Sequence, residues 1–190
     1  MSLDYAILGF LNYHPYTGYD LKKIFDTSIR HFWPADQSQI YRTLSRLTEQ
    51  GFAEMEKVPQ EDRPDRKVYH ITDLGRVELI NWLSGPPLMD EPRSAPLIQV
   101  FFAGQLSNEE ILAKFESFAA MMRGILAQYN QVPGQLGSFQ EEIPLPREHF
   151  FWLLTLDSGI RNMRANLEWA ESIIERIKNG QIPPRQGESS

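Results

Sequence analysis

The sequence predicts a mostly α-helical protein with a small β-wing, in which an N-terminal winged helix-turn-helix is followed by a C-terminal helical domain. Apolar residues recur at helical spacing through the first 85 residues, except in two short strand-like stretches around a charged loop. Glycine and prolines between residues 84 and 92 mark a boundary, and the periodic segments beyond it are all helical. We therefore expect domains at residues 1–85 and 92–180, and a disordered tail at 181–190.

The first two helices are separated by a polar break. The first runs from Leu3 to Leu11, and its shared apolar face comprises Leu3, Ile7, Leu8 and Leu11. The stretch NYHPYTG ends it, and Thr17 with Asp20 fits a capping box that opens the second helix. The buried face of that helix is expected to comprise Leu21, Ile24, Phe25 and Ile29.

The third helix is predicted from Asp36 to Gln50. Asp36 is suited to cap it, with Gln39 at the third helical position reaching back to the cap. Gly51 is a natural stop. Its apolar stripe comprises Ile40, Leu44 and Leu47. The polar residues expected mostly on the other faces are Gln37, Gln39, Arg42, Thr43 and Arg46.

A β-hairpin and a fourth helix complete the first domain. Phe52–Val58 and the alternating stretch KVYHIT are separated by the polar turn PQEDRPDR, which predicts two strands with a charged tip. Thr72 caps a helix that runs to about Leu83. Its buried face is expected to comprise Leu74, Val77, Ile80 and Leu83.

The second half is helical. A short apolar segment at 96–106 precedes a capping box formed by Ser107 and Glu110. The helix that follows has an apolar stripe of Ile111, Phe115, Phe118, Met122, Ile125 and Tyr129. A loop is expected at 132–146, because this stretch contains three prolines and two glycines.

The last helix carries the most regular pattern. Its apolar residues are spaced alternately by three and four positions, which is the period of a coiled coil. Because this short chain offers the helix too few partners to bury that stripe fully, a second copy of the chain is the expected partner. The interface of the predicted homodimer comprises Leu153, Leu156, Ile160, Met163, Leu167, Ile174 and Ile177.

Several classes of function lose support. The chain has no cysteine, which removes disulfides, thiolate metal sites and cysteine nucleophiles. Its four histidines show no metal-ligand spacing, and no glycine-rich phosphate loop or GxSxG motif occurs. We therefore expect no enzyme, catalytic residue, cofactor or metal site. No signal peptide or membrane span is evident, so a cytoplasmic location is expected.

Two segments are candidates for contact with double-stranded DNA. The net charge of −6 counts against a broadly basic footprint, but DNA binding needs only a local positive face. In the third helix the candidates are Gln37, Ser38, Gln39, Tyr41, Arg42 and Arg46; in the hairpin loop they are Arg63, Arg66 and Lys67. The alternatives are an ordinary amphipathic surface helix and a charged hairpin tip that keeps the protein soluble.

Residues 7–25, 33–54 and 62–79 together resemble the PadR family of bacterial transcriptional regulators. The resemblance is carried by Gly18-Tyr19, Ile40-Tyr41, Leu44, Leu47, Gly51, Arg66-Lys67, Tyr69, Thr72 and Gly75. The chain has Thr17 where members often have histidine, and threonine also caps a helix. The stretches PLIQVFFAGQLSNEEI and LDSGIRNMRANLEWAESIIERI are similar to the helical C-terminal domain of the longer-armed branch.

The resemblance implies a homodimeric repressor that occupies operator DNA and is released by a small molecule. An aromatic or hydrophobic effector would suit a pocket between subunits lined by Phe101, Phe102, Met122, Trp152 and Trp169, although these residues also fit a plain dimer core. Two other functions stay open. One is a winged helix that binds another protein and no DNA, and the other is a small hydrolase or isomerase in the helical half.

Overall fold

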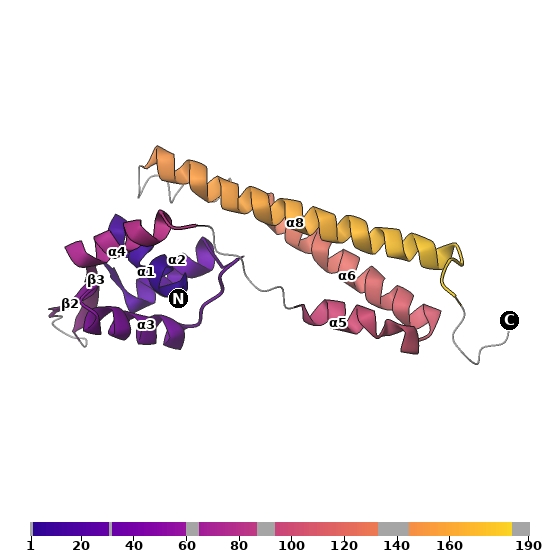
Figure 1. The fold of residues 1–190 in the computed structure, drawn as a ribbon, viewed down its shortest axis with the longest axis horizontal. Helices are drawn as coiled ribbons and strands as arrows, with labels where there is room; N and C mark the ends of the chain where they lie inside the picture. Colours follow the sequence, from indigo (N-terminus) through magenta and orange to yellow (C-terminus); the bar gives the residue numbers. More distant parts are fainter. Residues whose placement is uncertain (1, 31, 60–64, 87–93, 133–144, 184–190) are drawn as a thin grey trace. The chain divides into compact units, whose positions relative to one another are not determined.

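The computed structural model describes residues 2–30, 32–59, 65–86, 94–132 and 145–183. The chain divides into two compact units, residues 1–89 and 90–190. Helices make up most of the described residues, and the strands form one small antiparallel sheet, so the predicted fold class is confirmed (Figure 1). The described residues do not include Arg63, most of the predicted loop at 132–146 or the end of the predicted tail.

The N-terminal unit has the predicted order of helices and strands, with one addition. Its elements are α1 (Ser2–Tyr13), β1 (Tyr16–Thr17), α2 (Gly18–Thr27), α3 (Gln37–Glu49), β2 (Ala53–Val58), β3 (Arg66–Ile71) and α4 (Asp73–Leu83). The strand order is β1-β3-β2, and both pairings are antiparallel. The predicted two-stranded hairpin is therefore a three-stranded sheet. The sequence analysis missed β1 because two residues are too few to show a strand period.

The core of this unit is formed by the predicted stripes of the first three helices. Ile40, Leu44 and Leu47 of α3 are at most 1% exposed. They belong to the same cluster as buried residues of α1 and α2, namely Ile7, Leu8, Phe10, Leu11, Leu21 and Phe25. Ile24 and Ile29 are partly buried against this cluster. Thr43 is also buried, so placing it with the polar faces of α3 was wrong.

The predicted buried face of α4 is wrong. Leu74, Val77, Ile80 and Leu83 are between 55% and 60% exposed. The buried residues of this helix are Gly75 and Leu79. Apolar residues occur on both faces of α4, so spacing alone did not identify the inner one. Gly75 decides it, because a Cβ there would lie 2.1 Å from the carbonyl oxygen of Phe52 and only glycine permits this approach.

The C-terminal unit contains α5 (Ala95–Phe101), the 3₁₀ turn η1 (Ala103–Gln105), α6 (Asn108–Tyr129) and α8 (Pro146–Lys178). The predicted capping box at the start of α6 is present, with reciprocal hydrogen bonds between Ser107 and Glu110. Helices α6 and α8 lie side by side (Figure 1). They are antiparallel, because Glu116 early in α6 pairs with Lys178 at the end of α8, at 2.9 Å.

Part of the long stripe on α8 is buried within the chain, which corrects the expectation that it lacks internal partners. Ala170 belongs to the core cluster that also contains Phe115 and Ala119 of α6, and Leu167, Ile174 and Ile177 are partly buried against it. Helix α8 has 33 residues and α6 has 22, so α8 is longer by about 16 Å. Its N-terminal part carries the exposed residues Phe150, Phe151, Leu153 and Leu154.

Candidate nucleic-acid interface

The beginning of α3 is held by a complete capping box. The Asp36 carboxylate accepts a hydrogen bond from the Gln39 backbone N–H at 2.7 Å, and the Gln39 side-chain oxygen accepts one from the Asp36 N–H at 2.9 Å. The Ser38 hydroxyl also donates to Asp36, at 2.7 Å. The prediction of this cap is confirmed. One polar group of Ser38 and one of Gln39 are therefore already engaged in ordering the helix start.

These hydrogen bonds keep the cap charged. The Ser38 hydroxyl, and next the Gln39 N–H, hold the pKa of Asp36 below its usual value. The carboxylate is consequently ionised at neutral pH. It stabilises the positive end of the α3 dipole and places a negative charge beside the first turn. A phosphate would be repelled there, so the first turn is better suited to contacting base edges than the DNA backbone.

The outward face of α3 presents most of the predicted contact residues. Gln37, Ser38, Gln39, Tyr41 and Arg42 are all exposed. The Arg42 guanidinium leans back toward the first turn, and its Nε donates to the Ser38 carbonyl oxygen at 3.3 Å. One polar face therefore offers amide, hydroxyl, phenol and guanidinium groups over about two turns, and these groups can bind base edges and phosphates.

Tyr41 joins this face to the start of α2. A Cβ built on Gly18 would lie 2.5 Å from Cε1 of the Tyr41 ring, so the ring covers the glycine directly. Burial, and next the neighbouring Tyr41, raises the pKa of Tyr69 on β3. Tyr41 therefore lies where α2, α3 and the sheet meet, although its position in the sequence indicated only an exposed helical residue.

Arg46 is placed differently from the other predicted contacts. Its guanidinium forms an ion pair with Asp4 of α1, and Nη2 also lies 3.4 Å from the Thr43 hydroxyl. Asp4 is only 8% exposed. The arginine is thus engaged inside the unit. The sequence carried no signal for this pairing, because the two residues are 42 positions apart.

The wing carries a row of cations. Arg66 lies 3.2 Å from Asp20 of α2, and both side chains are partly exposed. Lys67 is exposed and directly opposite Lys57 in the register of β2 and β3. The sequence analysis missed Lys57, and only the register of the hairpin brings it beside Lys67. Like charges in this position repel each other, so a bound anion would stabilise them.

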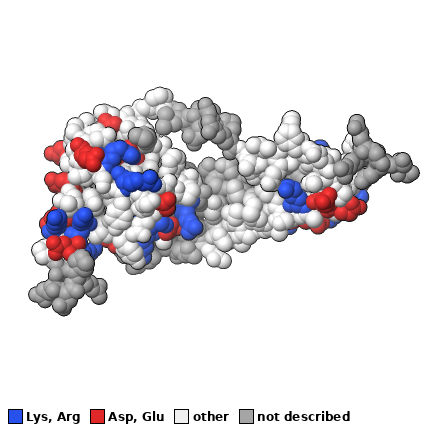
Figure 2. Space-filling view, turned by 90° about the horizontal axis from the view of Figure 1, so that it is seen from below, with Lys and Arg blue, Asp and Glu red and all other residues white. Residues whose placement is uncertain are grey.

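Charge on this unit is mixed. Figure 2 shows Lys and Arg side chains interspersed with Asp and Glu on one face of the N-terminal unit, without a continuous basic area. This agrees with the net charge of −6. Binding to a polyanion would therefore depend on a few placed cations more than on a broad positive field.

The five predicted effector-pocket residues are in different environments. Phe101 and Phe102 are 82% and 58% exposed and contact each other edge to face at 5.0 Å. Met122 is buried. Trp169 contacts Phe115 edge to face at 5.5 Å in the core of the unit, and Trp152 lies 4.8 Å from the His149 ring. Of these five residues, Phe101 and Phe102 form an open aromatic surface.

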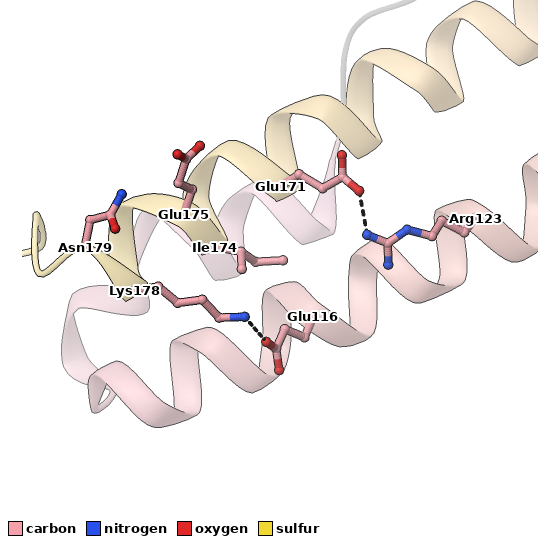
Figure 3. Close-up of a pocket in the computed structure, with 7 residues that line it drawn as sticks. All are labelled: Glu116, Arg123, Glu171, Ile174, Glu175, Lys178 and Asn179. Carbon is pink, nitrogen blue, oxygen red and sulfur yellow. Dashed lines mark hydrogen bonds and ion pairs between the residues drawn. The ribbon is translucent and has the colours of Figure 1, made fainter.

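One surface cavity lies between α6 and α8, with a volume of about 560 Å³. It is lined by Glu116, Arg123, Glu171, Ile174, Glu175, Lys178 and Asn179, none of which belongs to the predicted pocket (Figure 3). Two ion pairs cross it, Arg123 to Glu171 at 2.5 Å and Lys178 to Glu116 at 2.9 Å. Four of its five charged groups are thus paired across the cavity, and these two ion pairs connect the two helices.

Neither a metal site nor a membrane span is found in the part of the chain that the structure describes. No group of three or more His, Asp or Glu side chains there has the arrangement to hold a metal ion. Within the same residues, no helix combines the length and the apolar character needed to cross a bilayer.

The comparisons with known proteins cover both units. Residues 7–81 match the transcriptional regulator PadR-like family, and residues 92–178 match the family described as virulence activator alpha C-term. The chain is 28% identical over 176 residues to the negative transcriptional regulator PadR of Bacillus subtilis, covering 92% of this chain and 97% of that protein. It is 29% identical over 193 residues to a probable transcriptional regulator of Mycobacterium tuberculosis, covering 94% and 98%.

Solved structures give the same result. Bacillus subtilis PadR in complex with operator DNA superposes with a TM-score of 0.80 at 29% identity, covering 93% of this chain and 99% of that chain. The same protein in complex with p-coumaric acid gives 0.75 at 27% identity, covering 94% and 99%. The Vibrio cholerae virulence activator AphA gives 0.72 at 25% identity, covering 93% and 98%.

Proposed function

The chain belongs to the PadR-like family of transcriptional regulators, and on that premise we propose that it binds double-stranded operator DNA as a homodimer and represses transcription. The observation that carries the proposal is the exposed polar face of α3 on a winged helix that superposes on a PadR bound to operator DNA. DNA binding would place its action in the cytoplasm. We assign it no catalytic role.

Helix α3 is the proposed reading helix. A recognition helix enters the major groove with its N-terminal residues against base edges. Gln37, Ser38 and Gln39 occupy this end, next to the charged cap that disfavours a phosphate. Tyr41 and Arg42 follow and are assigned to phosphates or base edges.

The wing is assigned to the DNA backbone. Arg66 and Lys67 are retained from the predicted set, and Lys57 is added because it lies opposite Lys67. We assign Arg46 to α1 instead of DNA, since its guanidinium is already paired with Asp4. Arg63 stays a prediction, because it lies outside the described residues.

The homodimer is assigned to the C-terminal unit. Leu156 is buried within the chain, and Leu167, Ile174 and Ile177 pack against the internal core, so we assign the partner contact to the exposed apolar residues at the beginning of α8. Leu153 is 40% exposed there, and Phe150 and Phe151 add apolar surface beside it. Two recognition helices about 34 Å apart would then match half-sites one DNA turn apart.

Repression and release by a small aromatic molecule are proposed from the relatives. Bacillus subtilis PadR is described as a negative regulator, and one of its structures contains p-coumaric acid. In this chain, Phe101 and Phe102 are the exposed aromatic residues among the predicted pocket set. A flat aromatic ligand stacks well on such side chains.

The proposal is tested by selecting bound duplexes from a random pool and titrating the selected site by fluorescence anisotropy. Arg42→Ala should weaken binding by about 1–3 kcal/mol. Arg176→Ala, which removes an exposed arginine from the last turn of α8, is the matched control and should leave the affinity unchanged. If neither variant differs from wild type, Arg42 is not a contact residue.

The salt dependence separates DNA binding from the rival function, a winged helix that binds only another protein. Lys57, Arg42, Arg66 and Lys67 give eight candidate phosphate contacts in a dimer. The log of the association constant should therefore fall against log salt with a slope on the order of −7. Absence of binding to any duplex at low salt would favour the protein-interaction function.

A further inference from the structure

A buried ion pair ties the proposed reading helix to the first helix of the chain. Asp4 is buried, and its carboxylate accepts a hydrogen bond from the Arg46 guanidinium of α3. We propose that Asp4 is a positioning residue, which sets the orientation of α3 through Arg46 and thereby the specificity of operator recognition. The inference rests on the proposed function for its DNA consequence, while the positioning itself does not depend on DNA.

The pair constrains geometry because neither charge is well solvated. A buried carboxylate is costly unless it keeps its cationic partner, so the Asp4 side chain restricts where Arg46 can lie. The side chain of Arg46 is only 35% exposed. Its Nη2 also contacts the Thr43 hydroxyl at 3.4 Å, which orients the guanidinium along its own helix.

One donor of the arginine is left unsatisfied. The Arg46 Nε is buried and has no hydrogen-bond partner among the described residues. An arrangement selected only for stability would satisfy or remove this group, since an unsatisfied buried donor is destabilising. The pair therefore fits a role in placing the helix better than a role in maximising stability.

The position of Arg46 on α3 explains why its placement matters for recognition. Arg42 and Arg46 are four residues apart, so they lie on adjacent turns of the same helix. Ile40 and Leu44 anchor the buried side by non-directional contacts, which tolerate small rotations of the helix. A directional ion pair at Arg46 limits such rotation and fixes where the exposed Arg42 points.

The other end of the connection is itself held in place. Tyr5, next to Asp4 on α1, donates a hydrogen bond to Glu78 of α4 at 2.8 Å. The Tyr5 ring also stacks on Trp82 at 4.6 Å. Helix α1 is thus attached to α4 while Asp4 reaches α3, so α1 serves as a fixed reference against which the reading helix is oriented.

The experiment compares Asp4→Ala, Asp4→Asn and the double variant Asp4→Ala with Arg46→Met in the full-length chain. The Asn variant keeps a hydrogen-bond acceptor without the charge, and the double variant replaces the pair by apolar groups, which should restore thermal stability. Asp26→Asn is the control, because it breaks an exposed ion pair with Lys22 on α2. Circular dichroism verifies folding.

Two readouts are made on each variant. The chain has no cysteine, so Ser45→Cys on α3 and Asn81→Cys on α4 give one pair of sites per chain for nitroxide labels, and mixing labelled with excess unlabelled protein isolates the distance within one chain. Pulsed electron resonance measures their distance distribution without DNA. Anisotropy then measures affinity for the selected operator and for a random duplex.

Asp4→Ala is expected to broaden or shift the distance distribution and to lower operator affinity about tenfold, while random-duplex affinity changes less than about twofold. Asp4→Asn should lie between Asp4→Ala and wild type. The double variant should regain stability without regaining operator affinity. An unchanged distribution in Asp4→Ala, or wild-type operator affinity in the double variant, overturns the proposal. A broadened distribution in a protein that binds no duplex supports the positioning and refutes the proposed DNA function.

Discussion

Replacing Gly18 of α2 by alanine is expected to disturb the reading helix α3 through its residue Tyr41. The added Cβ would lie 2.5 Å from Cε1 and 2.6 Å from Cζ of Tyr41. Carbon atoms normally approach to about 3.5–4.0 Å, so the ring must move by about 1 Å. This movement occurs on the exposed face of α3, next to Arg42.

Two opposing terms set the cost in stability. Overpacking of this size destabilises a protein by about 1–3 kcal/mol. Alanine also lowers the entropy of the unfolded chain relative to glycine, which stabilises the protein by about 0.4–1 kcal/mol. The net loss in the free energy of unfolding should therefore be about 0–2.6 kcal/mol. Operator affinity should fall by about 1 kcal/mol or more, roughly fivefold, because Tyr41 is displaced.

Urea denaturation and anisotropy titration measure the two effects. Gly9→Ala is the matched control, since no atom lies within 4 Å of a Cβ at this position of α1. It should stabilise the protein by about 0.5–1 kcal/mol and leave operator affinity unchanged. Adding Gly18→Ala to Tyr41→Ala should cost no further stability, because the ring that it displaces is gone.

Two results would refute this reasoning. If Gly18→Ala binds operator as tightly as wild type, Tyr41 does not contribute to the interface. If Gly18→Ala destabilises the Tyr41→Ala protein as much as it destabilises wild type, the ring is not what resists the added methyl group.

Three further predictions concern stability. Thr72→Ala should lower the free energy of unfolding by about 1–2 kcal/mol, measured by urea denaturation. The Thr72 hydroxyl accepts a hydrogen bond from the Gly75 N–H at 3.0 Å and donates one to the Gly51 carbonyl oxygen at 2.7 Å. Thr72→Ser keeps the hydroxyl and should retain the stability. The lowered pKa of Asp36 contributes stability that is present above the unfolded-state pKa and is lost as pH falls through the folded-state pKa. Acid titration should therefore shrink the stability difference between wild type and Asp36→Asn as pH falls below about 4, and a difference that does not change with pH in this range would contradict this account. Phe115→Ala should destabilise the C-terminal unit by about 3–5 kcal/mol in thermal denaturation, because the ring is only 5% exposed and its removal leaves a cavity. A loss below about 1 kcal/mol would show that the surrounding residues fill this cavity.

Local signals predicted the first three helices well. The capping residues Thr17 and Asp36 act through their nearest neighbours in sequence, so the pattern alone was sufficient to identify the helix starts. The stripe of α3 was equally clear, because only one of its faces is apolar. The third strand was not predictable, since β1 is defined by its pairing with β3 and has only two residues.

Long-range contacts account for what the sequence did not predict. Helix α4 carries apolar residues on two faces, and the inner face is chosen by the close approach of Gly75 to Phe52. The stripe on α8 matched a coiled coil, but the partner of Leu167 and Ile174 is α6 of the same chain, and periodicity does not identify a partner.

The candidate site divides in the same way. The predicted contact residues Gln37, Ser38, Gln39, Tyr41 and Arg42 are exposed at the start of α3, while Ile40 between them is buried. Arg46 belongs to the same helix, yet its role is decided by Asp4, which no local pattern connects to it. Lys57 joined the wing only through the register of two strands.

Because α8 is longer than α6, its first turns lie far from the ion pairs that connect the two helices. The two ion pairs that cross between the helices, Arg123 to Glu171 and Glu116 to Lys178, grip only the last third of α8. Pro146 lies 25 residues before Glu171, about 38 Å along the helix, so a rotation of 10° at Glu171 moves the start of α8 by about 6–7 Å. A small rotation of α8 at these ion pairs therefore displaces the beginning of the helix by several ångströms. The stiffness of the contacts between α6 and the last turns of α8 thus limits how far the beginning of α8 moves.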